Sequence, residues 1–436
     1  MLQWQNSRHR RRDRIIFDSD RVDVPELSID WYGWIFVTTA KALIKPELLA
    51  WARKRAEVTA EDAAKAANVH VGDIHAWEVG ESAPTINQLR SIAAKYHFPL
   101  AVFYLSEPPE DFAPLRDFRR LPKAEKMGLT ANLAYHIRNA YERRELALEL
   151  YEDLGERPEP FPIKATLPAD PELIGRAIRE FLGVEDQAQK KAAGQAKIFD
   201  YWRRKLEEHN ILVFVISGPH YGVELDELRG FALAKDHLPV VVVNGKDYSQ
   251  GGKCFTLLHE LTHIVLGESA ISNGGFSRSG SAEEEKIEKF CDAVAAAALM
   301  PRDLVLSFPL FKPAGEKKWK DADLRLVARA IGVSREALLL RLVTLKRASW
   351  AFYMEERARF QEEYRLAANE KALAEKKSIP IKRPILLMSW NGRGFTRLVF
   401  RSYYDQRITL NDVSSYLGAK VKHISALERA AFQSAE

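Results

Sequence analysis

Two histidines and a glutamate within residues 254–267 have the types and spacing that fit a catalytic metal site. His259 and His263 stand four positions apart, and Glu260 directly follows the first of them. In a helix this spacing places both imidazoles on one face, one turn apart, so that their nitrogens can reach one zinc ion at about 2.0–2.1 Å. Glu260 is then placed to take a proton from a water molecule that the metal activates.

The residues around these three side chains are apolar on almost every side of the predicted helix, which ends at Gly267. Such a helix is buried rather than lying on the surface. Three ionisable side chains are costly to bury unless something compensates, and a bound metal ion does so. We therefore expect a zinc site rather than a chance match.

A second helix is predicted for Glu283–Met300, because apolar residues recur there with helical spacing. Glu288 and Asp292 lie one turn apart on a face that becomes fully apolar further along, so we expect that face to be buried. A carboxylate ligand can be followed one turn later by an acid that orients a ligating imidazole. Glu288 is accordingly predicted as the third zinc ligand, and Asp292 as the acid that orients a histidine.

Other ligands remain possible at this stage. Glu284 and Glu285 lie nearer the preceding loop, where we expect them to face water. Cys291 is close to the predicted ligands, but a small buried residue on the packing stripe is the interpretation we favour. We interpret Cys254, a little over one turn before His259, in the same way.

The composition of the 436 residues is that of a soluble globular chain, with 46% hydrophobic and 29% charged residues. No apolar run approaches the roughly 18–20 residues that a membrane span needs. Two cysteines cannot form a disulfide scaffold. No apolar segment follows the N-terminal arginines, which argues against secretion. We expect a cytoplasmic protein without a membrane partner.

Residues Lys45–Leu105 are predicted to form a compact set of helices. Two short helices, Ala60–Ala67 and Val71–Trp77, flank a tight turn at Asn68–His70, which is the helix-turn-helix arrangement. With Trp77-Glu78-Val79-Gly80 and Ala83-Pro84-Thr85, this stretch resembles the phage-repressor-like (XRE) DNA-binding family over about sixty residues.

The sequence leaves open whether this unit binds DNA. The positions that read bases in the XRE family fall here on Val71, Gly72 and Ala76, and on Ala60 in the preceding helix. None of these side chains can donate to a base edge. Residues 46–98 carry a net charge of −1, whereas residues 1–14 carry +4 of the chain's +5. The alternatives are sequence-specific DNA binding, with DNA-contacting residues unknown, and recognition of a protein partner.

The segment Phe255–His263, the later Glu288-Lys289-Phe290-Cys291-Asp292 and Leu299-Met300-Pro301 resemble the ImmA/IrrE-type metallopeptidase family. Leu115–Arg119 is similar to the segment that follows the linker in that family. The resemblance implies a thermolysin-like zinc peptidase in which His259, His263 and Glu288 hold Zn²⁺, Glu260 is the general base and Asp292 orients a histidine. Many members have Asn where this chain has Asp292.

Three strands are predicted before the first zinc helix, at Ile211–Ser217, Gly230–Ala234 and Pro239–Asn244, because β-branched runs there are bounded by Gly, Pro and Asp. Peptidases of the implied kind can hold an extended peptide against a sheet edge, and Gly230–Ala234 is the strand we expect at that edge. His220 and Tyr221 are loop candidates for an oxyanion donor, although solvated loop residues are the default.

The expected fold is multidomain and mainly α, with an N-terminal helix-turn-helix bundle and an α+β thermolysin-like (gluzincin) minimal peptidase core. Breaks rich in proline, glycine and charge divide the chain into seven predicted units. They are a basic arm and lead-in (1–40), the XRE-like domain (41–105), a linker (106–124), a helical module (125–210), the zinc peptidase core (211–312), a helical post-peptidase domain (313–372) and a C-terminal helical segment (373–436).

The function that these observations favour is a zinc-dependent endopeptidase fused to a repressor-like domain. The resemblance implies that its substrate is a regulatory protein such as a transcriptional repressor. The alternative is a DNA-binding transcriptional regulator or antitoxin-like protein that uses the zinc fold as a sensor or scaffold. A Glu260→Gln variant separates the two, because it removes the general base and leaves the metal ligands intact.

Overall fold

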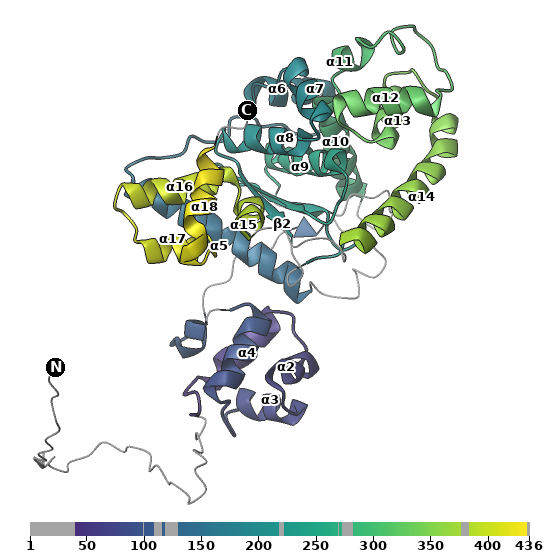
Figure 1. Ribbon diagram of the computed structural model, residues 1–436. Helices are drawn as coiled ribbons and strands as arrows, with labels where there is room; N and C mark the ends of the chain where they lie inside the picture. Colours follow the sequence, from purple (N-terminus) through teal and green to yellow (C-terminus); the bar gives the residue numbers. More distant parts are fainter. Residues whose placement is uncertain are drawn as a thin grey trace, which may run out of the picture.

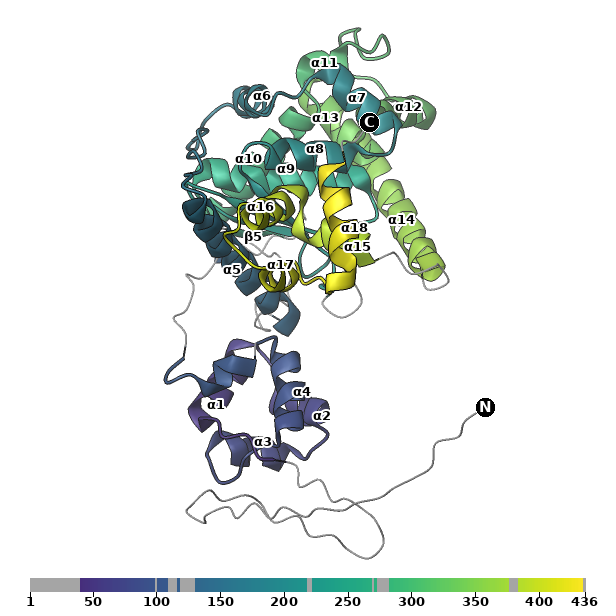
Figure 2. The same cartoon turned by 60° about the vertical axis from the view of Figure 1, so that its left-hand side comes forward.

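The computed structural model describes residues 40–98, 100–108, 116–117, 130–217, 222–268, 270–272, 282–375 and 383–433. The basic arm of residues 1–14 and the loop candidates His220 and Tyr221 lie outside these ranges, as does most of the predicted linker. Figures 1 and 2 show a smaller group of N-terminal helices and a larger part built around a sheet.

The N-terminal helices pack around a hydrophobic core of their own, which includes Leu49, Ile74 and Trp77. Thr59 caps the second helix by accepting a hydrogen bond from the amide of Asp62. The elements are α1 (Pro46–Arg55), α2 (Ala60–Ala67), α3 (Val71–Glu78), α4 (Ile86–Tyr96) and the 3₁₀ helix η1 (Leu100–Tyr104). The two predicted short helices are thus present, and α3 is one residue longer than expected.

A five-stranded sheet forms the centre of the larger part, in the order β1-β5-β3-β4-β2. Strands β2 and β4 are parallel, whereas β3 is antiparallel to both β4 and β5. The strands are β1 (Arg116–Asp117), β2 (Leu212–Ile216), β3 (Gly230–Leu233), β4 (Val240–Asn244) and β5 (Ala270–Ser272). Three of them lie within a residue or two of the predicted strands.

The prediction that Gly230–Ala234 forms a sheet edge is wrong. Strand β3 lies inside the sheet, where it pairs with β4 on one side and β5 on the other. The edges are β2 and the two-residue strand β1, which pairs in parallel with β5. Strand β5 comes from a segment rich in glycine and serine, which carries no strand pattern. Its pairing with β3 is therefore a long-range contact that local periodicity does not reveal.

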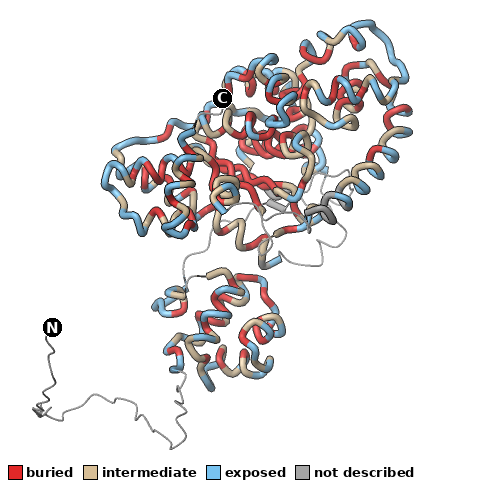
Figure 3. Tube along the Cα trace, viewed as in Figure 1, coloured by how far each residue is buried: buried red, intermediate tan, exposed pale blue. Residues whose placement is uncertain are grey.

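Alternate side chains of the strands enter two hydrophobic cores, one on each face of the sheet. Val213 and Val215 point into the core on the α9 side, whereas Phe214 and Phe231 belong to the core on the other side. Helices therefore cover both faces, and the buried strands between them are drawn in red in Figure 3.

The first face carries the helices that continue into the predicted post-peptidase region. Helices α9 and α10 carry the predicted metal ligands. Helix α6 packs closely on α10, since a Cβ atom on Gly175 would lie 2.7 Å from Cβ of Ala297. This side comprises α6 (Pro171–Phe181), α7 (Asp186–Gly194), α8 (Ile198–Glu207), α9 (Gln250–Leu266), α10 (Ala282–Leu299), α11 (Arg302–Leu306), α12 (Asp321–Ile331), α13 (Arg335–Thr344) and α14 (Trp350–Glu375).

The second face is covered by one helix from the middle of the chain and by the C-terminal helices, drawn in yellow in Figure 1. They are α5 (Ala131–Asp153), α15 (Arg383–Asn391), α16 (Arg393–Tyr404), α17 (Leu410–Tyr416) and α18 (Val421–Phe432). Helix α5 thus lies across the sheet from α6–α8, with which the sequence pattern groups it. Within the described ranges, no helix is long and apolar enough to cross a membrane.

Candidate metal centre

Helix α9 carries His259, Glu260 and His263 through the hydrophobic interior. The helix begins after Ser249, whose side chain accepts a hydrogen bond from the amide of Gly252, and it ends at Gly267 in the left-handed conformation. His259 is 3% exposed, and Glu260 and His263 are fully buried. The charge that these residues carry must therefore be compensated inside the protein.

Helix α10 packs against α9 and brings Glu288 to the two histidines. Its Oε1 lies 3.2 Å from Nε2 of His263, and its Oε2 lies 3.4 Å from Nε2 of His259. The two Nε2 atoms are themselves 3.2 Å apart. Two imidazole nitrogens and one carboxylate, three groups that can ligate a metal, therefore face one common point.

The separations fit a tetrahedral cation. Atoms that ligate zinc at about 2.0–2.1 Å in tetrahedral geometry lie about 3.3–3.4 Å from one another. Oε1 of Glu288 is buried and accepts no hydrogen bond within the part of the chain that the structure describes. Two imidazoles and one carboxylate form the donor set of catalytic zinc sites that keep a fourth position for water or substrate.

Asp292 lies behind His259, on the side away from Glu288. Its Oδ1 is 2.9 Å from Nδ1 of His259, a geometry in which this carboxylate can accept the proton of Nδ1 while Nε2 faces the common point. The side chain of Asp292 is 41% exposed, so the expectation that it is buried with Glu288 is wrong. Asp292 therefore lies where the site meets the surface.

The two imidazoles of the site differ in charge: burial lowers the pKa of His263, whereas the carboxylates raise that of His259. Burial opposes the charged form of His259, but Glu288 and Asp292 outweigh it and raise the pKa of this imidazole well above its ordinary value. Burial likewise disfavours ionised Glu288, yet His259 and His263 hold the pKa of this carboxyl well below its ordinary value. Glu288 is therefore a carboxylate, the form in which it can ligate a metal.

Cys291 is a further residue close to this point. Its Sγ lies within 4.8 Å of a ring nitrogen of each histidine, so that a His–His–Cys set is an alternative donor group. Cys291 is fully buried, and burial together with Glu288 and Asp292 raises the pKa of its thiol well above the ordinary value. We favour Glu288 as the third ligand, because its two oxygens lie closer to the histidine nitrogens.

The other candidate side chains lie away from the common point. Glu285 is exposed and forms an ion pair with Lys289 at 2.7 Å, and Glu284 is half-buried in the first turn of α10. Cys254 is buried in the core on the α9 side of the sheet, as its packing interpretation expects.

Strand β3 begins beside Glu260. A Cβ atom on Gly230 would lie 3.0 Å from Cγ of Glu260 and 2.7 Å from Cγ2 of Thr256. A side chain at this position would thus press on the predicted general base. The sequence analysis missed this role, although a glycine at the start of a β-branched strand is a signal of close backbone approach.

Helix α14 places a tyrosine near the outer side of the site. Tyr353 is 1% exposed, and its hydroxyl lies 3.4 Å from Oε1 of Glu336. Burial and Glu336 raise the pKa of Tyr353 to about 12, and the charge of Asp292 adds to this shift. The hydroxyl therefore stays protonated at neutral pH, within electrostatic reach of Asp292. No sequence pattern connects these residues.

Comparison with known proteins bears on the part of the chain that carries this site. Neither a curated protein nor a solved structure matches the chain. Residues 206–343 match the model of the IrrE N-terminal-like domain family, peptidase family M78. The matched segment runs from the end of α8 to α13, and it includes both helices of the metal centre. This segment is thus similar to a family of peptidases.

Proposed function

We propose that the protein is a zinc-dependent endopeptidase whose ion is held by His259, His263 and Glu288. The observation that carries this proposal is the convergence of two imidazole nitrogens, 3.2 Å apart, on the carboxylate of Glu288, with each nitrogen 3.2–3.4 Å from one of its two oxygens. The match of the surrounding segment to a peptidase family supports it independently.

Each residue then has a distinct task. Bound zinc supplies Lewis acidity and lowers the pKa of water towards neutrality. Glu260 takes the proton of the attacking water and later passes it to the leaving amine. Asp292 holds His259 in the tautomer that directs Nε2 towards the metal, and Gly230 leaves room for the carboxylate of Glu260.

We further propose that α1–α4 form an XRE-like helix-turn-helix unit that directs the peptidase to its substrate, a regulatory protein. Support comes from the tight turn between α2 and α3, where Asn68 adopts the left-handed conformation. The exposed start of α3 offers His70 and Gly72 rather than long donor side chains, and the unit has a net charge of −1. Recognition of a protein fits this surface better than base readout does.

The decisive experiment compares wild type with Glu260→Gln and with Glu285→Gln, a matched change on the exposed start of α10. All three should bind about one zinc ion per chain by metal analysis, because no proposed ligand changes. Cleavage of a proteome-derived peptide library, read by mass spectrometry, should fall about 100-fold or more in Glu260→Gln, the usual contribution of a general base.

Glu285→Gln should cleave as wild type does, and a chelator should abolish cleavage until zinc is restored. The proposal fails if zinc-loaded wild type generates no new peptide termini. It also fails if Glu260→Gln cleaves as fast as wild type. The alternative of a sensor or scaffold predicts zinc binding without cleavage in all three proteins.

A further inference from the structure

The C-terminal helices contain a two-helix unit that lies on the face of the sheet opposite α9. Helix α17 is followed by Leu417–Lys420 and then by α18, and Gly418 in this turn has a φ of 59°. Two short helices around a three- to four-residue turn that contains glycine form the helix-turn-helix arrangement. Helices α15 and α16 pack behind α18 and complete a small helical bundle.

The same arrangement of helix cap and turn occurs in the N-terminal helices, 350 positions earlier in the sequence. Thr409 caps α17 by accepting a hydrogen bond from the amide of Asp412, as Thr59 caps α2 through Asp62. The turn residue Gly418 corresponds to Asn68, and both adopt the left-handed conformation. The cap, the acidic third residue and the turn thus recur together.

Buried positions recur at the same offset. Val413 and Leu417 of the α17 region correspond to Ala63 and Ala67, and all four are buried. In the second helix, the buried residues Ile424 and Leu427 correspond to Ile74 and Trp77. Helices α17 and α18 therefore expose the same faces as α2 and α3.

The exposed face of α18 differs from that of α3 in chemistry. Lys420, Lys422, Ser425 and Arg429 are exposed on α18 and the turn before it. The corresponding residues of the α3 region are His70, Gly72, His75 and Val79. Lysine and arginine at the start and along the face of a second helix are the donors that contact phosphates and guanine edges.

The charge of the surrounding helices agrees with this difference. Residues 383–433 contain eight Lys or Arg and three Asp or Glu, a net charge of +5, compared with −1 for residues 46–98. A basic helix-turn-helix has the electrostatic footprint of a nucleic-acid-binding surface. The N-terminal unit lacks that footprint.

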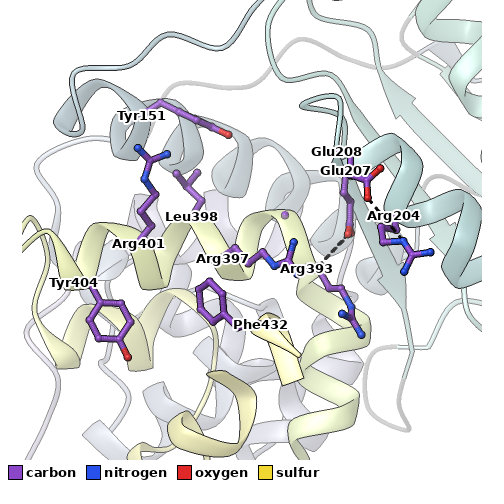
Figure 4. A pocket seen from close by; sticks show the side chains of 11 residues that line it. Tyr151, Arg204, Glu207, Glu208, Arg393, Arg397, Leu398, Arg401, Tyr404 and Phe432 are labelled. Carbon is purple, nitrogen blue, oxygen red and sulfur yellow. Dashed lines mark hydrogen bonds and ion pairs between the residues drawn. The ribbon is translucent and has the colours of Figure 1, made fainter. Parts of the chain in front are cut away.

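Arginines of α16 add to this positive charge. Arg393, Arg397 and Arg401 line a cavity of about 380 Å³ together with Tyr404 and Phe432, as Figure 4 shows. Arg393 and Arg397 donate to main-chain oxygens at the end of α18, and neither forms an ion pair with a described residue. Arg401, in contrast, pairs with Glu156, and the carboxylates of Glu207 and Glu208 line the same cavity.

We propose that α16–α18 form a second helix-turn-helix unit that binds duplex DNA, with α18 in the major groove. Lys420, Lys422 and Arg429 contact the phosphate backbone and base edges from its exposed face. The chain then combines a peptidase with a DNA-binding unit at its C-terminal side, and this role is independent of the N-terminal helices.

The test uses the full chain and a fluorescent 30-base-pair duplex of random sequence, with binding followed by anisotropy between 50 and 300 mM salt. In Lys420→Ala/Lys422→Ala/Arg429→Ala, affinity at 50 mM salt should fall about 10- to 100-fold. The slope of log affinity against log salt should shrink by up to about 3, since each lost phosphate contact lowers it by about 0.9.

A matched variant removes the same charge from exposed positions elsewhere, as Arg302→Ala/Lys312→Ala/Lys317→Ala, and should bind as wild type does. A second variant, Ser425→Glu, places a carboxylate on the exposed face of α18 and should also weaken binding. Circular dichroism and zinc content check that each variant is folded.

Three results overturn the proposal. The first would be that wild type binds no duplex at 50 mM salt. The second would be that the α18 variants bind duplex as tightly as wild type or the matched variant does. The third would be that single-stranded RNA of equal length displaces the labelled duplex more effectively than unlabelled DNA does. His70→Ala/His75→Ala should leave binding unchanged, and a large loss there would assign the DNA contact to α3 instead.

Discussion

At the scale of single residues, the type of the proposed metal centre depends on whether Glu288 or Cys291 of α10 is a ligand besides the two histidines. Glu288 and Cys291 both lie close to the nitrogens of His259 and His263. With Glu288 alone, the donor set leaves a position for water. With both, the ion would have four protein ligands and a closed, structural site.

We predict that Glu288→Ala lowers zinc affinity at least 100-fold, because it removes a ligand and leaves the charge of the ion uncompensated. Cys291→Ala should retain zinc with wild-type affinity, measured by competition with a chelating dye. Cys254→Ala, which empties a similar volume elsewhere in the core, serves as the control. Loss of zinc in Cys291→Ala with retention in Glu288→Ala would reverse the assignment.

At the scale of elements, the position of Glu260 depends on how closely β3 approaches α9. The strand can pass because Gly230 has no side chain, and Thr256 and Val242 close the space around it. A larger residue must push the strand or the helix away, and close-packed interiors resist such movement.

Gly230→Ala is therefore expected to lower the free energy of unfolding by about 1–3 kcal/mol and to reduce cleavage more than zinc binding. Denaturant titration, metal analysis and peptide cleavage measure the three effects separately. Gly72→Ala is the control, since a Cβ there meets nothing within 4 Å. Unchanged stability and activity in Gly230→Ala would mean that the strand can shift at no cost.

Asp321 joins three helices of the α9 side. It begins α12 and forms ion pairs with Arg325, with Arg335 of α13 at 2.5 Å and with Arg359 of α14 at 3.3 Å. Although burial opposes its charge, these arginines lower the pKa of Asp321 to about 2. A lowered pKa stabilises the fold above the unfolded value near 3.8, and this contribution disappears as the pH falls towards 2.

Asp321→Asn should therefore cost about 1–2 kcal/mol of unfolding free energy at pH 7, after allowance for solvent screening of these partly exposed groups. The difference from wild type should shrink between pH 4 and 2, as followed by urea unfolding at several pH values. Asp323→Asn, in the same helical turn, controls for charge at the helix start. A difference that is constant over this pH range would contradict the ion-pair explanation.

The parts of the fold that local pattern determines were predictable, and those that long-range pairing determines were not. The β-branched runs before α9 predicted three strands closely, and the i, i+4 spacing of His259 and His263 predicted one shared face. In contrast, no local signal shows that β5 pairs with β3 or that the hydroxyl of Tyr353 lies 3.4 Å from the carboxylate of Glu336. The packing of residues 383–433 against the sheet could not be predicted either, because an amphipathic pattern shows which face of a helix is buried but not which surface it packs against.

At the scale of the whole molecule, the N-terminal helices contact α5 through Arg138 and through the rings of His97 and Tyr135, whose centres lie 4.6 Å apart. Arg138 of α5 donates to the main-chain oxygens of Arg55 and Tyr96, at the ends of α1 and α4. Its guanidinium also lies 4.3 Å from the ring centre of Phe98. Burial and the neighbouring Arg55 lower the pKa of Arg138 to about 10, so that it remains charged at neutral pH.

Arg138→Ala should weaken the attachment of the N-terminal helices to α5, because charged hydrogen bonds to two helix ends and a cation–π contact are lost, together about 2–4 kcal/mol, while the His97–Tyr135 contact remains. Small-angle scattering should show a larger radius of gyration, with zinc content unchanged. Arg176→Ala, on the exposed face of α6, is the control. Identical scattering curves for the two variants would show that other contacts hold the helices in place.

The hydrophobic core shared by β2, α5 and α15–α18 has a consequence for biosynthesis. Helix α5 and strands β2–β4 precede residues 383–433 in the chain, so that only part of this core can form before α15–α18 are translated. Until then, the strand side chains that pack against α15–α18 remain without that cover, and the sheet is complete on the α9 face before it is complete on the other.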